Sequence, residues 1–219
     1  MTRPDLLVVV AGTGTEVGKT WATYAIAAAA GRDGRRVAAR KPVQSFDADG
    51  TGAPLAPTDA DLLAAATAED PAAVCPPHRW YPLAMAPPMA AVALGRPEPR
   101  FDELLAELCW PAGVELGLVA TAGGVRSPIA CDGDSAALAH RLAPDLVLLV
   151  ADAALGTINV TRLSIDALAP LEVVVLLNRY DDSDDLHRRN RAWLEDRDGL
   201  CVWVDPLAVI PVVGTRPAT

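Results

Sequence analysis

The sequence predicts an α/β fold: a doubly wound, mostly parallel sheet flanked by helices. Two observations support this prediction. Short runs rich in valine and leucine alternate with alanine-rich stretches along the chain, as buried parallel strands alternate with crossover helices. The first such run leads straight into a glycine-rich turn and then into an alanine-rich helical pattern, which is a strand–turn–helix unit.

Six strands and six helices are expected along the 219 residues. The strands are predicted at 6–11, 37–41, 117–121, 146–151, 173–178 and 202–204. The helices are predicted at 20–31, 59–68, 101–109, 135–142, 160–168 and 183–196. Proline-rich stretches at 46–61 and 76–89 are predicted to be irregular loops. The chain shows no internal repeat and no clear boundary, so residues 1–219 are expected to form a single domain.

Composition and charge exclude several classes of function. The formal net charge is −9 and no stripe of Lys and Arg is present, which argues against binding to nucleic acid or to an anionic membrane. No apolar window approaches the roughly 18 residues of a membrane span. The four cysteines lack CxxC spacing and the three histidines are isolated, so neither a disulfide framework nor a structural zinc site is expected. The first apolar run has no basic leader, and a cytoplasmic protein is expected.

A phosphate-binding loop is predicted at "AGTGTEVGKT", residues 11–20. Amides at the start of a helix can surround a phosphate, the Lys19 ammonium can reach the β- and γ-phosphates, and the Thr20 hydroxyl can bind Mg²⁺. A bare glycine-rich turn would explain Gly12 and Gly14 equally well. It would not explain Lys19 and Thr20 at the opening of a helix that follows a buried strand. A nucleoside triphosphate and Mg²⁺ are therefore the expected ligands.

This loop departs from the usual pattern, in which glycine stands five places before Gly18, where this chain has Thr13. In this it resembles the dethiobiotin synthetase family, whose loop reads Gly-Thr-x-Thr-x-Val-Gly-Lys-Thr. Further segments are similar to that family and follow in its order: "RKPVQS" from Arg40, "TDADLL" from Thr58, "LGTINVTRLSIDAL" from Leu155, "VVVLLN" ending at Asn178, and "VIPV" around Ile210. Members of the family usually carry a further helical segment after the last of these.

The resemblance implies a role for each matched residue. The implied catalytic residues are Lys41 and Lys19, the implied Mg²⁺ ligands are Thr20 and Asp59, and the implied diamine contacts are Thr13, Thr15 and Ser45. The implied nucleotide contacts are Glu16, Val17, Gly18, Lys19, Thr20, Trp21, Asp59, Gly123, Asn178, Ile210 and Pro211. From the residues alone, Lys41 could equally be a surface lysine before a proline turn. Asp59 and Asp61 could be acids at the start of a helix, and Asn178 a turn former.

The activity implied by the resemblance is the ATP-dependent joining of CO₂ to 7,8-diaminononanoate. This closes the cyclic urea of dethiobiotin in biotin biosynthesis. The family is homodimeric, and the stretch 82–91, "PLAMAPPMAA", resembles the segment at the dimer contact. The implied partners are therefore small molecules and a second copy of the chain.

One position departs from the family in a way that bears on activity. The third strand in the family ends Val-Glu-Gly-Ala-Gly-Gly, whereas this chain has "VATAGG", so Ala120 replaces a glutamate that binds Mg²⁺ and nucleotide. Alanine has no ligand atom. A degenerate relative that binds nucleotide with little turnover is therefore one alternative. The other is a ParA/MinD-like regulatory ATPase, although the second loop lysine that marks that class is missing between Gly12 and Val17.

Overall fold

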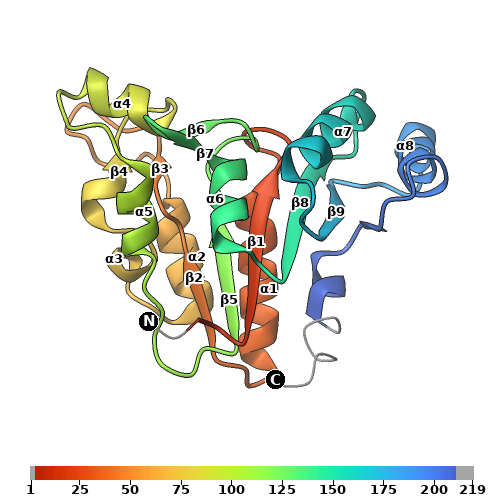
Figure 1. Cartoon of the computed structure of the whole chain (residues 1–219), viewed down its shortest axis with the longest axis horizontal. Helices are drawn as coiled ribbons and strands as arrows, with labels where there is room; N and C mark the ends of the chain where they lie inside the picture. Colours follow the sequence, from red (N-terminus) through yellow and green to blue (C-terminus); the bar gives the residue numbers. More distant parts are fainter. Residues whose placement is uncertain (1–2, 211–219) are drawn as a thin grey trace.

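The computed structural model describes residues 3–210, and its centre is a parallel sheet (Figure 1). The strand order is β10-β9-β8-β1-β5-β2, and every neighbouring pair is parallel. The strands are β1 (Leu6–Gly12), β2 (Val37–Arg40), β5 (Leu116–Ala120), β8 (Leu146–Asp152), β9 (Val173–Asn178) and β10 (Val202–Trp203). All six predicted strands are confirmed to within one residue at each end, and so is the predicted α/β class.

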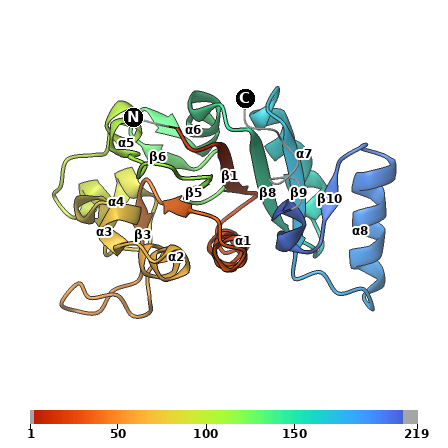
Figure 2. The same ribbon diagram turned by 90° about the horizontal axis from the view of Figure 1, so that it is seen from below.

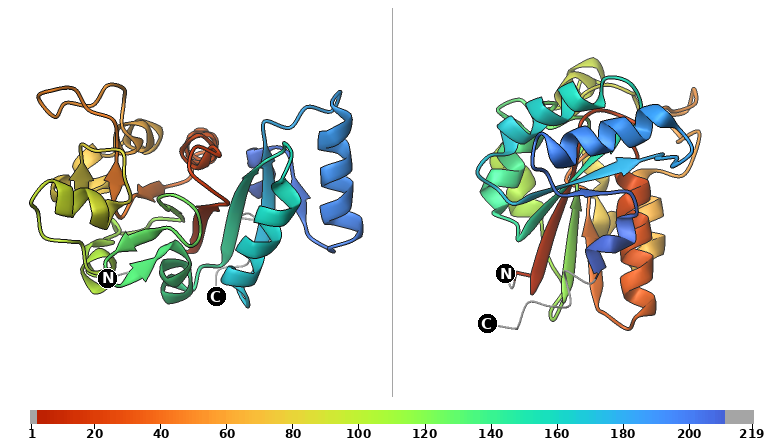
Figure 3. Two further views of the ribbon diagram at one scale, coloured as in Figure 1. Left: turned by 90° about the horizontal axis from the view of Figure 1, so that it is seen from above. Right: turned by 90° about the vertical axis from the view of Figure 1, so that its right-hand side faces the viewer.

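Both faces of the sheet are covered, which explains why its strands are continuous apolar runs. Successive side chains of a strand point to opposite faces. Val8 and Val10 of β1 pack with Ile26 of α1 on one face, and Val9 packs with the cluster that contains Leu138 of α6 on the other. Figure 2 and the left panel of Figure 3 show α1 and α2 on one side of the sheet and α6 and α7 on the other.

The six predicted helices are present, with adjusted ends. They are α1 (Lys19–Arg32), α2 (Asp59–Thr67), α5 (Phe101–Glu107), α6 (Ser135–Leu142), α7 (Thr157–Leu168) and α8 (Asp185–Asp196). The largest difference is at α7, which begins three residues before the predicted position 160. Gly156 takes the left-handed conformation there, with φ 96°, and so forms the N-cap directly after the loop that leaves β8.

The prediction for 76–89 was wrong, because this stretch is largely ordered into short elements. It contains a 3₁₀ turn (η1, Pro77–Arg79), β4 (Trp80–Tyr81) and the start of α4 (Pro87–Ala93). Proline is favourable in the first turn of a helix, so the prolines that suggested a loop instead open η1, α4 and the preceding α3 (Pro71–Val74). β4 pairs with β3 (Gln44–Ser45), which continues from the end of β2.

The remaining short elements are a hairpin of β6 (Pro128–Ala130) and β7 (Gly133–Asp134) and a 3₁₀ turn (η2, Pro206–Ala208). The stretch 46–58 is irregular as predicted, apart from a single bridge between Ala48 and Pro54. No helix within residues 3–210 is both long enough and apolar enough to cross a bilayer.

The sheet topology marks where a ligand can bind. The chain runs from β1 to β2 at one edge, returns to β5 beside β1, and then crosses to β8 on the other side of β1. Ligands of open α/β sheets bind outside the carboxyl ends of the strands where the order reverses in this way. The glycine-rich loop leaves the carboxyl end of β1 at that point.

Candidate active site

The glycine-rich loop depends on glycine at both of its ends. A Cβ atom at Gly12 would lie 2.9 Å from side-chain carbons of Lys19 and Val17. Gly18 has φ 101°, and a Cβ there would lie 2.0 Å from the Nδ2 atom of Asn178. At Thr13, the position where glycine is usual, a side chain is accommodated, and the amide donates to the Val150 carbonyl at 2.9 Å. The displaced glycine is therefore compatible with a phosphate-binding loop.

Asn178, the last residue of β9, and Arg179 after it hold the far side of this loop. The Nδ2 atom of Asn178 donates to the Val17 carbonyl at 2.9 Å, and an Nη atom of Arg179 donates to the Glu16 carbonyl at 2.7 Å. Arg179 also pairs with Asp152 at the end of β8, at 2.6 Å. Glu16 is itself in the left-handed region, with φ 60°. The loop conformation is thus fixed from the ends of two neighbouring strands.

Lys19 opens α1 and is buried at the centre of the loop. Its Nζ atom donates to the Gly14 carbonyl at 2.7 Å. Burial, and after it the positive charge of Lys41, lower the pKa of Lys19 from 10.5 to about 8, while Asp59 opposes this shift. An anion bound beside it would stabilise the charged form of Lys19.

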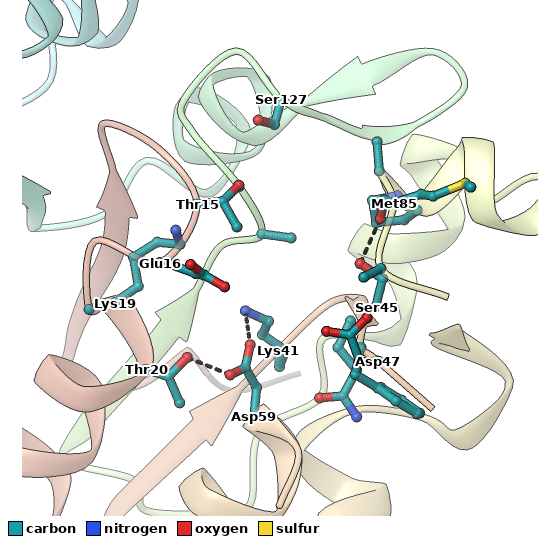
Figure 4. Close-up of a pocket in the computed structure, with 18 of the residues that line it drawn as sticks. Thr15, Glu16, Lys19, Thr20, Lys41, Ser45, Asp47, Asp59, Met85 and Ser127 are labelled. Carbon is teal, nitrogen blue, oxygen red and sulfur yellow. Dashed lines mark hydrogen bonds and ion pairs between the residues drawn. The ribbon is translucent and has the colours of Figure 1, made fainter. Parts of the chain in front are cut away.

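Thr20, Asp59 and Lys41 form one hydrogen-bonded network (Figure 4). The Thr20 hydroxyl donates to one Asp59 oxygen at 2.6 Å, and the Lys41 Nζ atom lies 2.6 Å from the other. Burial alone would raise the pKa of Asp59. The charge of Lys41 and the hydrogen bonds from Lys41 and Thr20 outweigh that effect and hold the pKa below its ordinary value.

Lys41 is not a surface lysine, which resolves one alternative left open by the sequence. It is 3% exposed, and its Nζ atom also donates to the Thr121 carbonyl at 3.0 Å. Asp59 is both a helix-start acid and a member of the network, because the capping box of Thr58 and Asp61 begins α2 directly at Asp59. Asp61 is used in that capping box.

Ala120 is the last residue of β5 and is fully buried. It packs in the apolar cluster shared by β1 and α1, and it pairs with Val10 in the sheet. The neighbouring Thr121 hydroxyl is directed at the Val10 carbonyl, at 3.4 Å. Among residues 3–210, no group of three or more His, Cys, Asp or Glu side chains is placed to hold a metal ion. A metal here would therefore depend on Thr20, Asp59 and oxygens of the nucleotide.

A cavity of ≈ 790 Å³ opens in front of this network. Ten of the sequence-predicted residues line it: Thr15, Glu16, Gly18, Lys19, Thr20, Trp21, Lys41, Ser45, Asp59 and Gly123. Four others lie outside its lining: Thr13, Val17, Asn178 and Ile210. Val17 and Asn178 support the loop, and Ile210 packs against the apolar cluster beneath α1. Pro211 lies outside the described residues.

The opposite wall of the cavity was not predicted. It is formed by Gln44, Phe46 and Asp47 after β2, by the segment 84–87, and by Ser127 and Pro128. Figure 4 shows Ser45, Asp47 and Glu16 directed into the space between the two walls. The Ser45 hydroxyl donates to the Met85 carbonyl at 2.6 Å, which ties the two segments of this wall together. Gln44 lies within "RKPVQS" and 84–87 within the stretch 82–91, but neither was predicted from the sequence to have a role in the site.

Comparison with known proteins agrees with this geometry. A family model described as an AAA domain matches residues 7–215. An ATP-dependent dethiobiotin synthetase of Mycobacterium avium is 40% identical over 74% of this chain and 69% of its own length. That of Streptomyces avermitilis is 38% identical (84% and 75%), and that of Rhodococcus erythropolis is 32% identical (95% and 87%).

One solved structure, a signal recognition particle 54 kDa protein of Aeropyrum pernix with GDP, covers 97% of this chain and 46% of its own at 18% identity. Its TM-score of 0.46 is too low to bear on the fold or the function. These three relatives are at least 32% identical to this chain, and the matches cover more than two thirds of both chains. The chain belongs to the dethiobiotin synthetase family.

Proposed function

We propose that this protein is an ATP-dependent dethiobiotin synthetase that closes a cyclic urea from CO₂ and the vicinal diamine 7,8-diaminononanoate. The observation that carries this proposal is the position of Lys41. It lies buried between the phosphate-binding loop and the wall that holds Ser45, and it is bonded to Asp59 at 2.6 Å. A single cation can there serve both a phosphate on one side and a diamine-derived anion on the other.

The chemistry needs positive charge at two places at once. A carbamate forms on one amine, its oxygen attacks the γ-phosphate of ATP, and the second amine then displaces phosphate from the mixed anhydride. Negative charge grows on the carbamate and on the phosphoryl oxygens together. Lys19 and the first amides of α1 hold the transferring phosphate, and Lys41 neutralises charge between it and the carbamate. Both ammonium groups are already in place at the cavity.

The Ser45 hydroxyl oxygen can accept a hydrogen bond from an amine. Because its own proton goes to the Met85 carbonyl, the Ser45 oxygen is left as an acceptor facing the cavity. An amine N–H of the diamine can donate to it, and Thr15 faces the same space from the loop. Thr13 does not line the cavity and orients the diamine, on this proposal, only through the backbone of the loop.

The donor set fits Mg²⁺, a cation that binds to oxygen and often needs only one or two carboxylates besides phosphates. Thr20 and Asp59 would hold it, and their oxygens are already together at 2.6 Å. When bound, Mg²⁺ supplies charge neutralisation on the phosphate oxygens. Lys41 would then exchange its bond with Asp59 for contacts with substrate oxygens.

Recognition of the purine base is proposed for Asn178, Ile210 and Pro211, with Trp21 and Gly123 nearer the phosphates. Two copies of the chain are proposed to associate through 82–91. This stretch includes the start of α4, where Met89 is 61% exposed.

A second candidate function rests on Ala120. Because this buried residue carries no carboxylate, the chain could bind Mg²⁺ and ATP without efficient turnover. An assay of purified protein with Mg²⁺-ATP, bicarbonate and diaminononanoate decides between the two. Phosphate release that depends on diamine supports the synthetase. Binding without release supports the second candidate, and release without diamine would point to a regulatory ATPase.

The Lys41→Ala variant tests the residue that carries the proposal. Turnover should fall on the order of 10²–10³-fold or more, as when one group that stabilises transition-state charge is removed. The Kd for ATP should change little, since Lys19 and the loop amides remain. Lys19→Ala is the matched variant and should lose ATP binding as well. Equal loss of ATP binding in both variants would contradict the role of Lys41.

A further inference from the structure

Gln44 carries a buried hydrogen-bond donor that has no acceptor among the residues the structure describes. The side chain is 2% exposed and lines the cavity one residue before Ser45. Its Oε1 atom accepts from the backbone N–H of Ala60 at 3.0 Å, in the first turn of α2 directly after Asp59. Its Nε2 atom is buried and has no hydrogen-bond partner within residues 3–210.

The direction of this donor is fixed by its own oxygen. If the two ends of the amide were exchanged, an NH₂ group would face the N–H of Ala60, and two donors would oppose each other. The contact with Ala60 therefore decides which end is nitrogen. An unsatisfied buried donor is destabilising, and such groups in native proteins call for a functional explanation.

The place of Gln44 distinguishes it from the other buried polar atoms without partners. Those are the hydroxyls of Thr157 and Thr161, both on α7 and neither lining the cavity. Gln44, by contrast, lies in the segment that also supplies Lys41 and Ser45, and it touches the helix that presents Asp59. Gln44 therefore lines the same cavity as Lys41, Ser45 and Asp59.

A neutral NH₂ group can only donate, so its partner must be an acceptor. Lys19 and Lys41 make the cavity attractive to anions, and a triphosphate would compete with Asp59 for the Lys41 ammonium. Because Gln44 is hydrogen-bonded to the residue after Asp59, an anion that reaches the Lys41–Asp59 pair also approaches this amide.

We propose that the Nε2 atom of Gln44 is a substrate-contacting donor to an anionic oxygen, either of the carbamate or of the transferring phosphoryl group. This inference rests on the proposed function. It assigns a role to a residue between the catalytic lysine and the diamine-binding serine. The bond would form only in the complex, so it would favour the bound state over the free protein.

Gln44 is the only glutamine in the sequence, so its NH₂ group can be observed alone. Protein labelled with ¹⁵N only in the glutamine side chain should give one pair of NMR signals. Spectra are recorded free, with Mg²⁺ and the β,γ-imido analogue of ATP, and then with diaminononanoate and bicarbonate added. A downfield shift on adding the nucleotide analogue identifies a phosphoryl oxygen, and one that needs diamine and bicarbonate identifies the carbamate. No shift in either arm overturns the inference.

Two variants separate substrate contact from packing. Gln44→Glu keeps the size and the acceptor for Ala60 but removes the donor, and it should weaken substrate binding or turnover by roughly 10–100-fold, as for a lost hydrogen bond to a charged group. Thr161→Val removes an unpartnered buried hydroxyl elsewhere and should leave kcat and KM unchanged. Unaltered kinetics in a folded Gln44→Glu protein would contradict the proposal.

The wild-type assay separates failure of this inference from failure of the proposed function. Diamine-dependent phosphate release without any shift of the Gln44 signals removes the role of Gln44 and leaves the synthetase in place. Absence of diamine-dependent release removes the synthetase. In that case a shift with the nucleotide analogue alone still supports donation to a phosphoryl oxygen.

Discussion

Two buried ammonium groups face one cavity, and they differ in what neutralises them. Lys41 is paired with Asp59, whereas Lys19 is hydrogen-bonded to a carbonyl oxygen. Burial, and after it repulsion by the charge of Lys41, lowers the pKa of Lys19. A triphosphate relieves this repulsion by bringing several negative oxygens to both groups. Nucleotide binding and the protonation of Lys19 must therefore be coupled.

Affinity for ATP should fall as the pH rises above about 8. Below the pKa of free Lys19 the ammonium is already charged, and binding takes up no proton. Above it the free protein has lost that proton and must regain it to bind phosphate, so Kd should rise by up to tenfold per pH unit. Calorimetry in two buffers of different ionisation heat should show proton uptake near pH 8. A flat profile between pH 7 and 9.5 would contradict this coupling.

Ala120 limits what the metal site can do. It is fully buried among apolar side chains at the end of β5, on the sheet face that α1 also covers. On the proposed assignment, the carboxylate of Asp59 would be the single negative protein ligand of Mg²⁺. Loss of a residue that supports a metal ligand typically lowers metal affinity or activity by about 10–100-fold.

The Ala120→Glu variant should therefore change stability and metal affinity in opposite directions. Without ligands the folded protein should be destabilised by several kcal/mol, because a carboxylate is placed in an apolar cluster. With the ATP analogue present, Mg²⁺ affinity should rise on the order of 10–100-fold. Ala120→Gln has nearly the same size without the charge, so it should show the loss of stability alone. Equal Mg²⁺ titrations for both variants would show that no carboxylate at position 120 reaches the metal.

At the scale of elements, the first turn of α2 positions Asp59 against the phosphate-binding loop. Thr58 caps the helix, its hydroxyl accepting from the Asp61 amide, and the Asp61 carboxylate in turn accepts from the Thr58 amide at 2.8 Å. The Gln44 side chain accepts from the Ala60 amide in the same turn. The direction in which Asp59 leaves the helix therefore depends on this cap.

Loss of the cap should reduce both stability and turnover. Thr58→Ala is expected to cost about 0.5–2 kcal/mol of unfolding free energy, measured by urea denaturation. It should also lower kcat, because Asp59 loses its fixed place beside Thr20 and Lys41. Asp184 is the N-cap of α8, away from the cavity, and its side chain accepts from the amides of Leu186 and His187. Asp184→Ala removes this cap and serves as the control. A similar loss of stability with full activity is expected there, and equal activity in both variants would contradict the argument.

How far the sequence predicts these elements depends on where their stability comes from. The six strands of the sheet are apolar on both faces, so their pattern is visible in the sequence itself. The elements β3, β4, β6 and β7 have at most three residues, too few to show a period. The prolines at 76–89 also mark helix starts as readily as loops. The second wall of the cavity is built from these short pieces, and it was therefore missed.

The same distinction holds for the site. Lys19 and Thr20 follow from the phosphate-binding loop motif itself, whereas Lys41 and Asp59 were predicted from the resemblance to the family. Gln44 and Asp47 become recognisable only when β3 and the segment 84–87 are placed opposite the loop. Asn178 is proposed to contact the base, and what the structure shows is that its side chain donates to the Val17 carbonyl. Such a contact between β9 and the loop depends on the sheet order.

At the scale of the whole molecule, the cavity joins segments from both sides of β1. The loop of β1, the start of α1 and Arg179 after β9 form one wall, while the residues after β2, the segment 84–87 and residues 127–128 form the other. In Figure 1, α4 lies above β3 on one side of the molecule, and α7 lies beside the top of β8 on the other side. ATP is proposed to bind the first wall and the diamine the second.

Hydrogen exchange should therefore show protection in two stages. The ATP analogue with Mg²⁺ should slow exchange in 13–20 and at 178–179, because it fixes the loop and the residues bonded to Val17 and Glu16. Diaminononanoate and bicarbonate should then slow exchange in 44–47 and 84–87. The exposed helix α8 lies at the far edge of the sheet and serves as an internal control that neither ligand should protect (Figure 3). If the analogue alone protected both walls to the same extent, nucleotide and diamine would not occupy separate halves of the cavity, and the assignment of Ser45 to the diamine would fail with it.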